Sequence, residues 1–235
     1  MANSARTQPG VEKEVTPVEI IDDSSALDKI TLLYEQHKKT ISTVATVVVV
    51  AVVGYFGYTK WYKAPGEEKA AAAMAMPQLY FQADSMNLAL NGDGKNMGFV
   101  KIEKKYDGTA AGNLAHYYAG IAYLKTGDFK KAIKALSDFD GKGTLLATQA
   151  NGSLGEAYME TNEYAKAIEY FKKATSDKND ILLTPLYLYH LGLAYEANKQ
   201  PNDAKETFKR IRDEYPRSVH ARDMDKELAR LGDLD

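Results

Sequence analysis

Eighteen consecutive residues, from Ile41 to Tyr58, carry no charge and are rich in valine. A helix rises about 1.5 Å per residue, so this stretch covers roughly 27 Å, close to the bilayer's hydrocarbon thickness of about 30 Å. Thr40 and Thr59, on either side, are also uncharged and can lengthen the helix. The pattern predicts one membrane-spanning helix.

Both ends of this stretch carry residue types that are typical of the borders of a membrane span. At the near end these are His37, Lys38 and Lys39, and at the far end they are Tyr55, Phe56, Tyr58, Lys60, Trp61, Tyr62 and Lys63. Aromatic rings favour the membrane interface, and lysine side chains can extend to it. A helix buried in a soluble core is therefore disfavoured.

A cleaved signal peptide is the other alternative. It would begin with a short basic region and would have small residues directly after the apolar stretch. Here the preceding forty residues contain five Lys or Arg against seven Asp or Glu, and the alanine-rich segment that starts at Ala70 lies beyond several charges. We therefore expect an uncleaved anchor.

The chain before the span divides into two parts. Residues 1–24 are polar, acidic and interrupted by Pro9, Gly10 and Pro17, and they have too little apolar surface to offset the entropy of ordering, so we expect a disordered tail. Leu27, Ile30, Leu33 and Tyr34 then recur at helical spacing. The pattern predicts an amphipathic helix that continues into the span, with the whole helical segment covering residues 25–63.

The charges that flank the span do not orient it. Lys29, Lys38 and Lys39 precede it, and Lys60, Lys63 and Lys69 follow it. The positive-inside rule compares the numbers of such residues on the two sides, and here they are equal.

The second part of the chain contains an internal repeat. Its three copies run from Leu114 to Leu136, from Ala150 to Phe171 and from Leu186 to Phe208. The shared positions are a glycine (Gly120, Gly155, Gly192), a tyrosine three residues on (Tyr123, Tyr158, Tyr195), an alanine nine further (Ala132, Ala167, Ala204) and a large apolar residue after four more (Leu136, Phe171, Phe208). The glycines recur after 35 and 37 residues.

This skeleton resembles the tetratricopeptide repeat (TPR), whose pattern is W-x2-L-G-x2-Y, then A-x3-F, then P. Pro216 ends the third copy as in the family, whereas His116, Asn151 and Leu188 stand where the family has tryptophan. The resemblance implies three helical hairpins over residues 113–216, in which the glycines allow close helix packing. Gly127 and Asn162 suit left-handed caps at the hairpin turns.

Flanking segments extend the repeats on both sides. Over residues 64–112, helices at Glu67–Leu90 and Asn96–Lys105 are expected to form a degenerate first hairpin around a turn. In residues 217–235 an amphipathic pattern predicts a capping helix, because a terminal repeat needs a polar outer face. The expected fold class is therefore all-α, a single N-terminal transmembrane helix followed by a TPR-type solenoid of helical hairpins with a C-terminal capping helix.

Composition excludes several kinds of chemistry. The net charge is −2 and cysteine is absent, so nucleic-acid binding, disulfides and cysteine nucleophiles are not expected. The loop at Asn91 to Gly94 departs from an EF-hand, with Ala89 and Val100 where calcium ligands are required. The four histidines are scattered, and no serine has a neighbouring base that suggests a catalytic triad. We expect neither an enzyme nor a cofactor or metal site.

With these kinds of chemistry excluded, the sequence points to a protein-binding surface. In the TPR family the first helices of the hairpins line the concave side, and the resemblance implies a partner-binding set between their packing positions. This set is Tyr117, Ile121, Lys125, Gln149, Glu156, Glu160, Tyr189, Leu193 and Glu196. Packing of the aromatic members against adjacent hairpins is an equal alternative.

The order of these parts, from acidic tail through single span and alanine-rich helix to TPR hairpins, resembles the YfgM-like ancillary subunits of the bacterial Sec translocon. The resemblance implies a single-pass inner-membrane protein with a cytoplasmic N-terminus and a periplasmic repeat domain. Its implied partners are the Sec translocon and envelope chaperones or client polypeptides, so the implied function is that of a scaffold in protein secretion.

Two questions stay open at this stage. A stripe of small and branched residues on the span is a candidate contact for membrane partners: Thr43, Val47, Val50, Gly54 and Gly57. Ordinary lipid-facing sequence is the alternative. The chain also fits a TPR adaptor of an outer-membrane assembly, secretion or cell-wall machine, in which the helix is only a tether.

Overall fold

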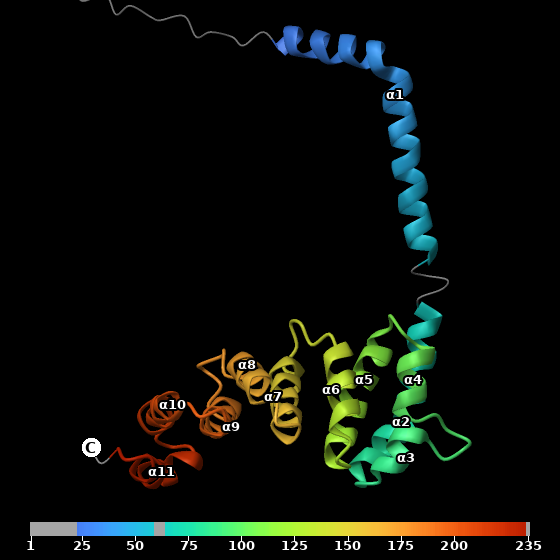
Figure 1. Cartoon of the computed structure of the whole chain (residues 1–235). Coiled ribbons are helices and arrows are strands. Elements are labelled where there is room, and N and C mark those ends of the chain that lie inside the picture. The colour runs from blue at the N-terminus through green and yellow to red at the C-terminus, as the bar shows by residue number, and fades with distance from the viewer. Residues whose placement is uncertain (1–22, 59–63, 234–235) are drawn as a thin grey trace, which may run out of the picture. The chain divides into compact units, whose positions relative to one another are not determined.

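The computed structural model describes residues 23–58 and 64–233, and within these ranges the regular elements are helices (Figure 1). Two compact units are present, Met1–Gly57 and Tyr58–Asp235. They are described separately below. The expected disordered tail lies outside the described residues, except for its last two positions, which begin the first helix.

One helix, α1 (Asp23–Gly57), makes up the described part of the first unit. Its segment Tyr34–Gly57 has a mean hydropathy of 2.0 and is long and apolar enough to cross a membrane, by length and composition alone. None of this segment is buried. The hydroxyl groups of Thr43 and Thr46 donate to the carbonyl oxygens of Lys39 and Ser42, both at 2.8 Å, so the helix satisfies these polar groups internally. Residues 59–63, with the expected aromatic border at Trp61 and Tyr62, lie outside the described residues.

The second unit begins with α2 (Ala64–Gln82), α3 (Met86–Asn91) and α4 (Phe99–Lys105). The helix that we expected from Glu67 to Leu90 is therefore broken. Asp84 takes a left-handed conformation with φ 56°, and the Ser85 N–H donates to the Tyr80 carbonyl oxygen at 2.8 Å. This is a Schellman cap, which closes one helix and lets the chain start another.

Three hairpins follow, as the repeat predicts. They are α5 (Ala110–Lys125) with α6 (Phe129–Asp138), α7 (Leu146–Glu160) with α8 (Tyr164–Ala174), and α9 (Leu183–Ala197) with α10 (Pro201–Glu214). Figure 1 shows these helices stacked in chain order from green to red. The all-α solenoid fold predicted from the sequence is confirmed.

The repeat glycines lie where two helices of a hairpin meet. A Cβ added at Gly155 would be 2.6 Å from Cδ1 of Phe171, and one added at Gly192 would be 2.6 Å from Cζ of Phe208. Both phenylalanines are fully buried. The aromatic ring of the second helix therefore occupies the space that a glycine leaves on the first helix, which is why these two positions recur together.

Each hairpin turn uses the same left-handed cap. Gly127 and Asn162 have φ 78° and 60°, which confirms the prediction for these two positions. The third turn uses Lys199, with φ 61°. The N–H of the residue after each cap donates to a carbonyl five residues back, and this bond ends the first helix.

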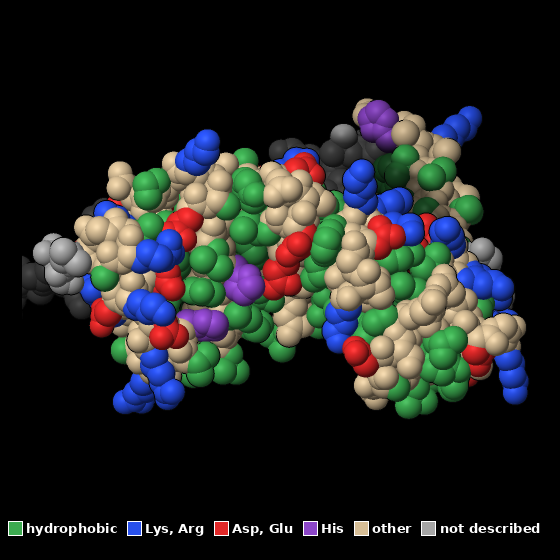
Figure 2. All heavy atoms as spheres, turned by 60° about the horizontal axis from the view of Figure 1, so that its bottom comes forward, with side chains coloured by type: hydrophobic (Ala, Val, Ile, Leu, Met, Phe, Trp, Pro, Cys, Tyr) green, Lys and Arg blue, Asp and Glu red, His purple; other side chains and the backbone are tan. Residues whose placement is uncertain are grey.

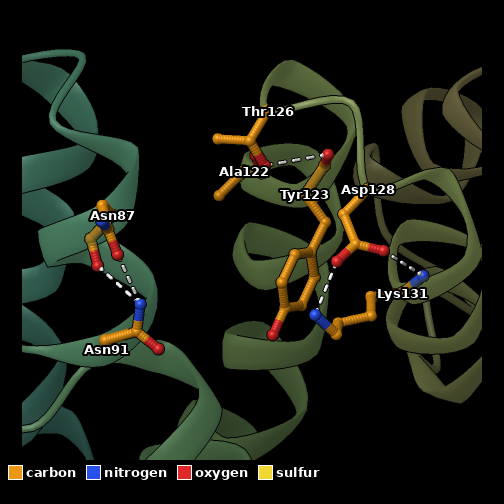
Figure 3. A network of polar contacts seen from close by, with 7 residues as sticks. All are labelled: Asn87, Asn91, Ala122, Tyr123, Thr126, Asp128 and Lys131. Carbon is orange, nitrogen blue, oxygen red and sulfur yellow. Dashed lines mark hydrogen bonds and ion pairs between the residues drawn. The ribbon is translucent and has the colours of Figure 1, made fainter.

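Polar side chains fix the first of these turns (Figure 3). The Thr126 hydroxyl donates to the Tyr123 carbonyl oxygen at 3.1 Å, and Asp128 both caps α6 and pairs with Lys131 at 2.6 Å. The Lys131 ammonium also lies 5.3 Å from the centre of the Tyr123 ring. These contacts are local, so the sequence around the turn determines its geometry.

The chain ends in η2 (His220–Asp223) and α11 (Met224–Arg230). Met224 and Leu228 are buried in the core of the last two hairpins. On the outside, Arg230 pairs with Glu196 of α9 at 2.7 Å, and Lys209 of α10 pairs with Asp233 at 2.7 Å. The segment thus has one apolar and one charged side, as a terminal cap requires.

The loop between α3 and α4 is organised by Asp93. Its carboxylate accepts the backbone N–H groups of Lys95 and Asn96 at 2.9 and 2.6 Å and the Tyr80 hydroxyl at 2.6 Å. The hydrogen bonds from Asn96 and Tyr80 lower the pKa of Asp93 well below its usual range. The Asp93 carboxylate thus joins the loop backbone to Tyr80 of α2.

Candidate functional site

A groove of about 490 Å³ lies on the first helices of the three hairpins. It is lined by Leu124 of α5, Phe129 of α6, Glu156, Met159 and Glu160 of α7, and His190 and Leu193 of α9. Figure 2 shows acidic, histidine and hydrophobic side chains adjoining on one face of the repeat domain. Because the groove draws on all three hairpins, it exists only when they are stacked.

The groove brings together three residues of the predicted partner-binding set, Glu156, Glu160 and Leu193. Glu156 and Glu160 are four residues apart on α7 and therefore share one face of the helix. Burial raises the pKa of the Glu156 carboxyl group. Leu193 lies on the neighbouring first helix, so the groove combines carboxylates with an apolar wall.

His190 also lines the groove and lies among aromatic rings. Its ring centre is 5.7 Å from that of Phe171 and 6.1 Å from that of Tyr189. Burial, and to a lesser extent the charge of His220, lowers the pKa of His190. At neutral pH the imidazole is therefore neutral and adds no positive charge to the groove.

Other members of the predicted set are engaged within the protein. Tyr117 is buried, and its hydroxyl donates to Oε1 of Gln149 at 2.9 Å, which joins α5 to α7. Ile121 packs against the core. Lys125 pairs with Asp84 at 3.0 Å. These residues contribute to the stacking of the hairpins.

The last two members lie near the C-terminal cap. The Tyr189 ring stacks on that of His220 with 5.4 Å between centres, and Glu196 forms the ion pair with Arg230. They therefore join α9 to the cap.

Four groove residues are absent from the set predicted by sequence: Leu124, Phe129, Met159 and His190. The sequence suggests for His190 only a packed histidine or a metal ligand. Phe129 belongs to the start of a second helix, outside the first helices from which the set is drawn. Met159 directly precedes Glu160, and this position next to a predicted residue is the one feature of the sequence that could have identified Met159 as part of the groove.

A second apolar pocket, of about 520 Å³, lies near the C-terminal end of the solenoid. Ile181, Leu182 and Val219 line it and are 73, 77 and 72% exposed. Pro185 and Pro216 complete its apolar floor. Ile181, Leu182 and Val219 lie in the segments before α9 and after α10, and none of these three occupies a position of the repeat pattern.

His116 and Glu103 form a semi-buried pair between α5 and α4. His116 Nδ1 and Glu103 Oε2 are 3.3 Å apart, but their alignment does not make a hydrogen bond, and neither atom has another hydrogen-bond partner. Glu103 raises the pKa of His116. In the part of the chain that the structure describes, no group of three or more His, Asp or Glu side chains is placed to hold a metal ion.

Most of the predicted stripe on α1 is exposed. Val47 and Val50 are 62 and 66% exposed, and a Cβ at Gly54 would meet no atom within 4 Å. The stripe is therefore available to a partner or to lipid, and its role as a membrane contact stays a prediction.

Comparisons with known proteins agree with this geometry. Two family models, both described as tetratricopeptide repeat, match residues 117–181 and 187–218. The chain thus contains TPR repeats, and TPR domains mediate protein–protein interactions. No curated protein sequence matches the chain.

Among solved structures, the chain is similar to Podosopora anserina crystal structures described as nearly identical TPR-like repeats of a putative kinesin light chain. One has 14% identity and a TM-score of 0.52, and the match covers 70% of this chain and 86% of that one. A form of the same repeats with a single substitution has 15% identity and the same TM-score, with coverages of 70 and 85%. At these identities the similarity shows the fold alone.

Proposed function

We propose that this protein is a membrane-anchored, non-enzymatic scaffold that binds a segment of another polypeptide in the groove of its TPR domain. The observation that carries the proposal is the groove itself. It is formed jointly by the three hairpins and combines an apolar lining with two carboxylates. A concave surface with few polar groups among apolar ones is typical of a binding site.

The anchor in this proposal is α1. Its apolar segment leaves its side chains exposed, which is favourable in lipid and costly in water. By its resemblance to the YfgM-like family, the protein would be a single-pass protein of a bacterial inner membrane, with a cytoplasmic N-terminus and a periplasmic repeat domain. The same resemblance names the Sec translocon and envelope chaperones or clients as partners.

Crosslinking from inside the groove tests the binding function. A photoreactive phenylalanine at Met159 is expected to capture a polypeptide in native membranes, because Met159 lines the groove. The same residue at Lys134, whose side chain is 78% exposed on α6, is the matched control and should capture much less. Mass spectrometry of the adducts would identify the partner.

The outcomes of this experiment separate the proposals. Adducts with Sec subunits, envelope chaperones or secreted chains support the translocon role, whereas adducts with an outer-membrane or cell-wall machine support the adaptor alternative. Equal labelling from both positions, or none from Met159, would remove the groove as the binding site.

The orientation can be measured because the chain has no cysteine of its own. In Leu145→Cys the thiol would replace a side chain that is 93% exposed in the repeat domain, and Ser4→Cys would place one before α1. With a membrane-impermeant thiol reagent on cells with a permeabilised outer membrane, we expect labelling of the Leu145→Cys protein only. Labelling of Ser4→Cys alone would reverse the proposed orientation, and labelling of both in sealed inner membranes would argue against a span.

A further inference from the structure

The carboxyl group of Glu156 lies in the groove without a compensating charge. Burial raises the pKa of this carboxyl group, and Glu156 forms no ion pair or hydrogen bond within the described part of the chain. Glu160, one turn further along α7, lines the same groove and also takes part in none of the ion pairs among the described residues. Glu160 is exposed, but Glu156 is half-buried, and a half-buried carboxylate without a partner opposes folding, so stability does not account for the position of Glu156.

Several other glutamates of the repeat domain are paired. Glu163 binds Lys166 at 2.6 Å, and Glu169 binds Lys173 at 2.7 Å. Glu196, on the next first helix, binds Arg230 at 2.7 Å. Glu206 on α10 has no such partner either, but it is exposed, whereas Glu156 lacks a partner although it is half-buried in the groove.

The rest of the groove is apolar and uncharged. Leu124, Phe129, Met159 and Leu193 supply its hydrocarbon surface, and His190 is neutral at neutral pH because burial lowers its pKa. The groove therefore presents negative charge against apolar walls. A ligand that matches it needs a cationic end and a hydrocarbon stem.

We propose that the groove takes a lysine or arginine side chain of the partner polypeptide, with its charged end on Glu156 and Glu160 and its methylene groups against Met159 and Leu193. This inference rests on the proposed function, because it specifies what the bound segment carries. Charge-assisted hydrogen bonds between a carboxylate and a guanidinium or ammonium group are stronger than neutral ones. Binding would thus supply the partner that Glu156 lacks in the free protein.

A metal ion is a poorer match for the same charges. The described residues provide no group of three His, Asp or Glu side chains placed to hold a metal ion, and the apolar side chains of the groove add no ligand atom suited to a hard cation. A basic side chain needs only the two carboxylates and uses the hydrocarbon surface as well.

Four matched peptides test this inference on the full-length protein in detergent micelles. Each is an acetylated, amidated and fluorescein-labelled nonapeptide of leucine, alanine and serine, and they differ only at the central residue, which is arginine, lysine, norleucine or glutamate. Fluorescence anisotropy should give an affinity for the arginine and lysine peptides about tenfold or more above that for norleucine, and weaker binding still for glutamate. Added salt should reduce the preference.

Substitutions at Glu156 and Glu160 test whether these two carboxylates cause the preference for a basic central residue. In Glu156→Gln/Glu160→Gln the preference for a basic centre should disappear, and in Glu156→Lys/Glu160→Lys it should reverse toward the glutamate peptide. Glu169→Gln is the matched control, because Glu169 is exposed and lies on the second helix of its hairpin. It should leave all four affinities unchanged.

A folding measurement shows whether a loss of binding is caused by unfolding of the variant. Because Glu156→Gln removes a half-buried charge that has no ion-pair partner, the thermal midpoint of this variant by circular dichroism should equal or exceed that of the parent protein. A marked decrease would assign Glu156 a structural role and would overturn the proposal.

The remaining outcomes are equally decisive. Equal affinity for the four peptides would overturn the inference and leave the groove as a binding site. Failure of all four to bind would also overturn it, and the crosslinking from Met159 would then decide the proposed function separately.

Discussion

Replacing Phe208 by alanine is expected to lower the free energy of unfolding by about 3–5 kcal/mol, the usual cost of truncating a buried phenylalanine. Phe208 is fully buried, and its ring lies against Gly192 of the facing helix. The glycine has no side chain that can move into the vacated space, so the cavity would stay open. Urea titration of the full-length protein in detergent, followed by circular dichroism, measures the loss.

Two further variants test whether the loss of stability comes from the contact between Phe208 and Gly192. Leu145→Ala removes a side chain that is 93% exposed and should change the stability by less than about 0.5 kcal/mol. Gly192→Ala alone should destabilise because its Cβ would lie 2.6 Å from Cζ of Phe208, but in the Phe208→Ala background the same change should cost little. Additive effects of the two substitutions would show that the ring and the glycine do not share this space.

The repeat could be predicted from the sequence because its main contacts are local. Gly155 and Phe171 are sixteen residues apart, on the two helices of one hairpin, and the same pair occurs at Gly192 and Phe208. A glycine followed by a large apolar residue at a fixed spacing can be recognised from the amino-acid order alone. The hairpins and their stacking follow from that pattern.

Helix ends that depend on an unusual residue in a left-handed conformation were not predictable. Asp84 and Lys199 both adopt positive φ, where glycine or asparagine is the usual choice. Nothing in the local pattern distinguishes Asp84 from a helical aspartate, so the sequence does not reveal the break between α2 and α3. The cap at Asn162 was predictable because asparagine favours this conformation.

In the candidate site, too, some features could be predicted from the sequence and others could not. Glu156, Glu160 and Leu193 could be selected because the TPR resemblance assigns the first helices to the concave side and helical spacing places these residues between the packing positions. The engagement of Tyr117 with Gln149, and of Glu196 with Arg230, depends on partners 32 and 34 residues away. Sequence spacing identified the side of the helix, and only tertiary contacts determine which of its carboxylates remain unpaired.

Gly98→Ala is expected to destabilise the first part of the repeat domain by up to about 3 kcal/mol, the upper end of the usual cost of overpacking. Gly98 precedes α4, and an added Cβ would collide with the carbonyl oxygen of Leu90 and lie 2.5 Å from the backbone nitrogen of Gly92. These are backbone atoms, which cannot rotate away as a side chain can. The φ of Gly98 is −86°, which alanine adopts readily, so the effect isolates the close approach from backbone strain.

The matched control is Gly66→Ala, in α2. A Cβ at Gly66 would meet no atom within 4 Å, and alanine is the better helix former by about 1 kcal/mol. This substitution should therefore leave the stability unchanged or raise it. Hydrogen exchange would locate the effect of Gly98→Ala, because the amides of α3 and α4 should lose protection before those of α9 and α10, which belong to a different core cluster. Equal stability of the two variants would mean that the loop between α3 and α4 can open without cost, and that the close approach at Gly98 does not hold these helices together.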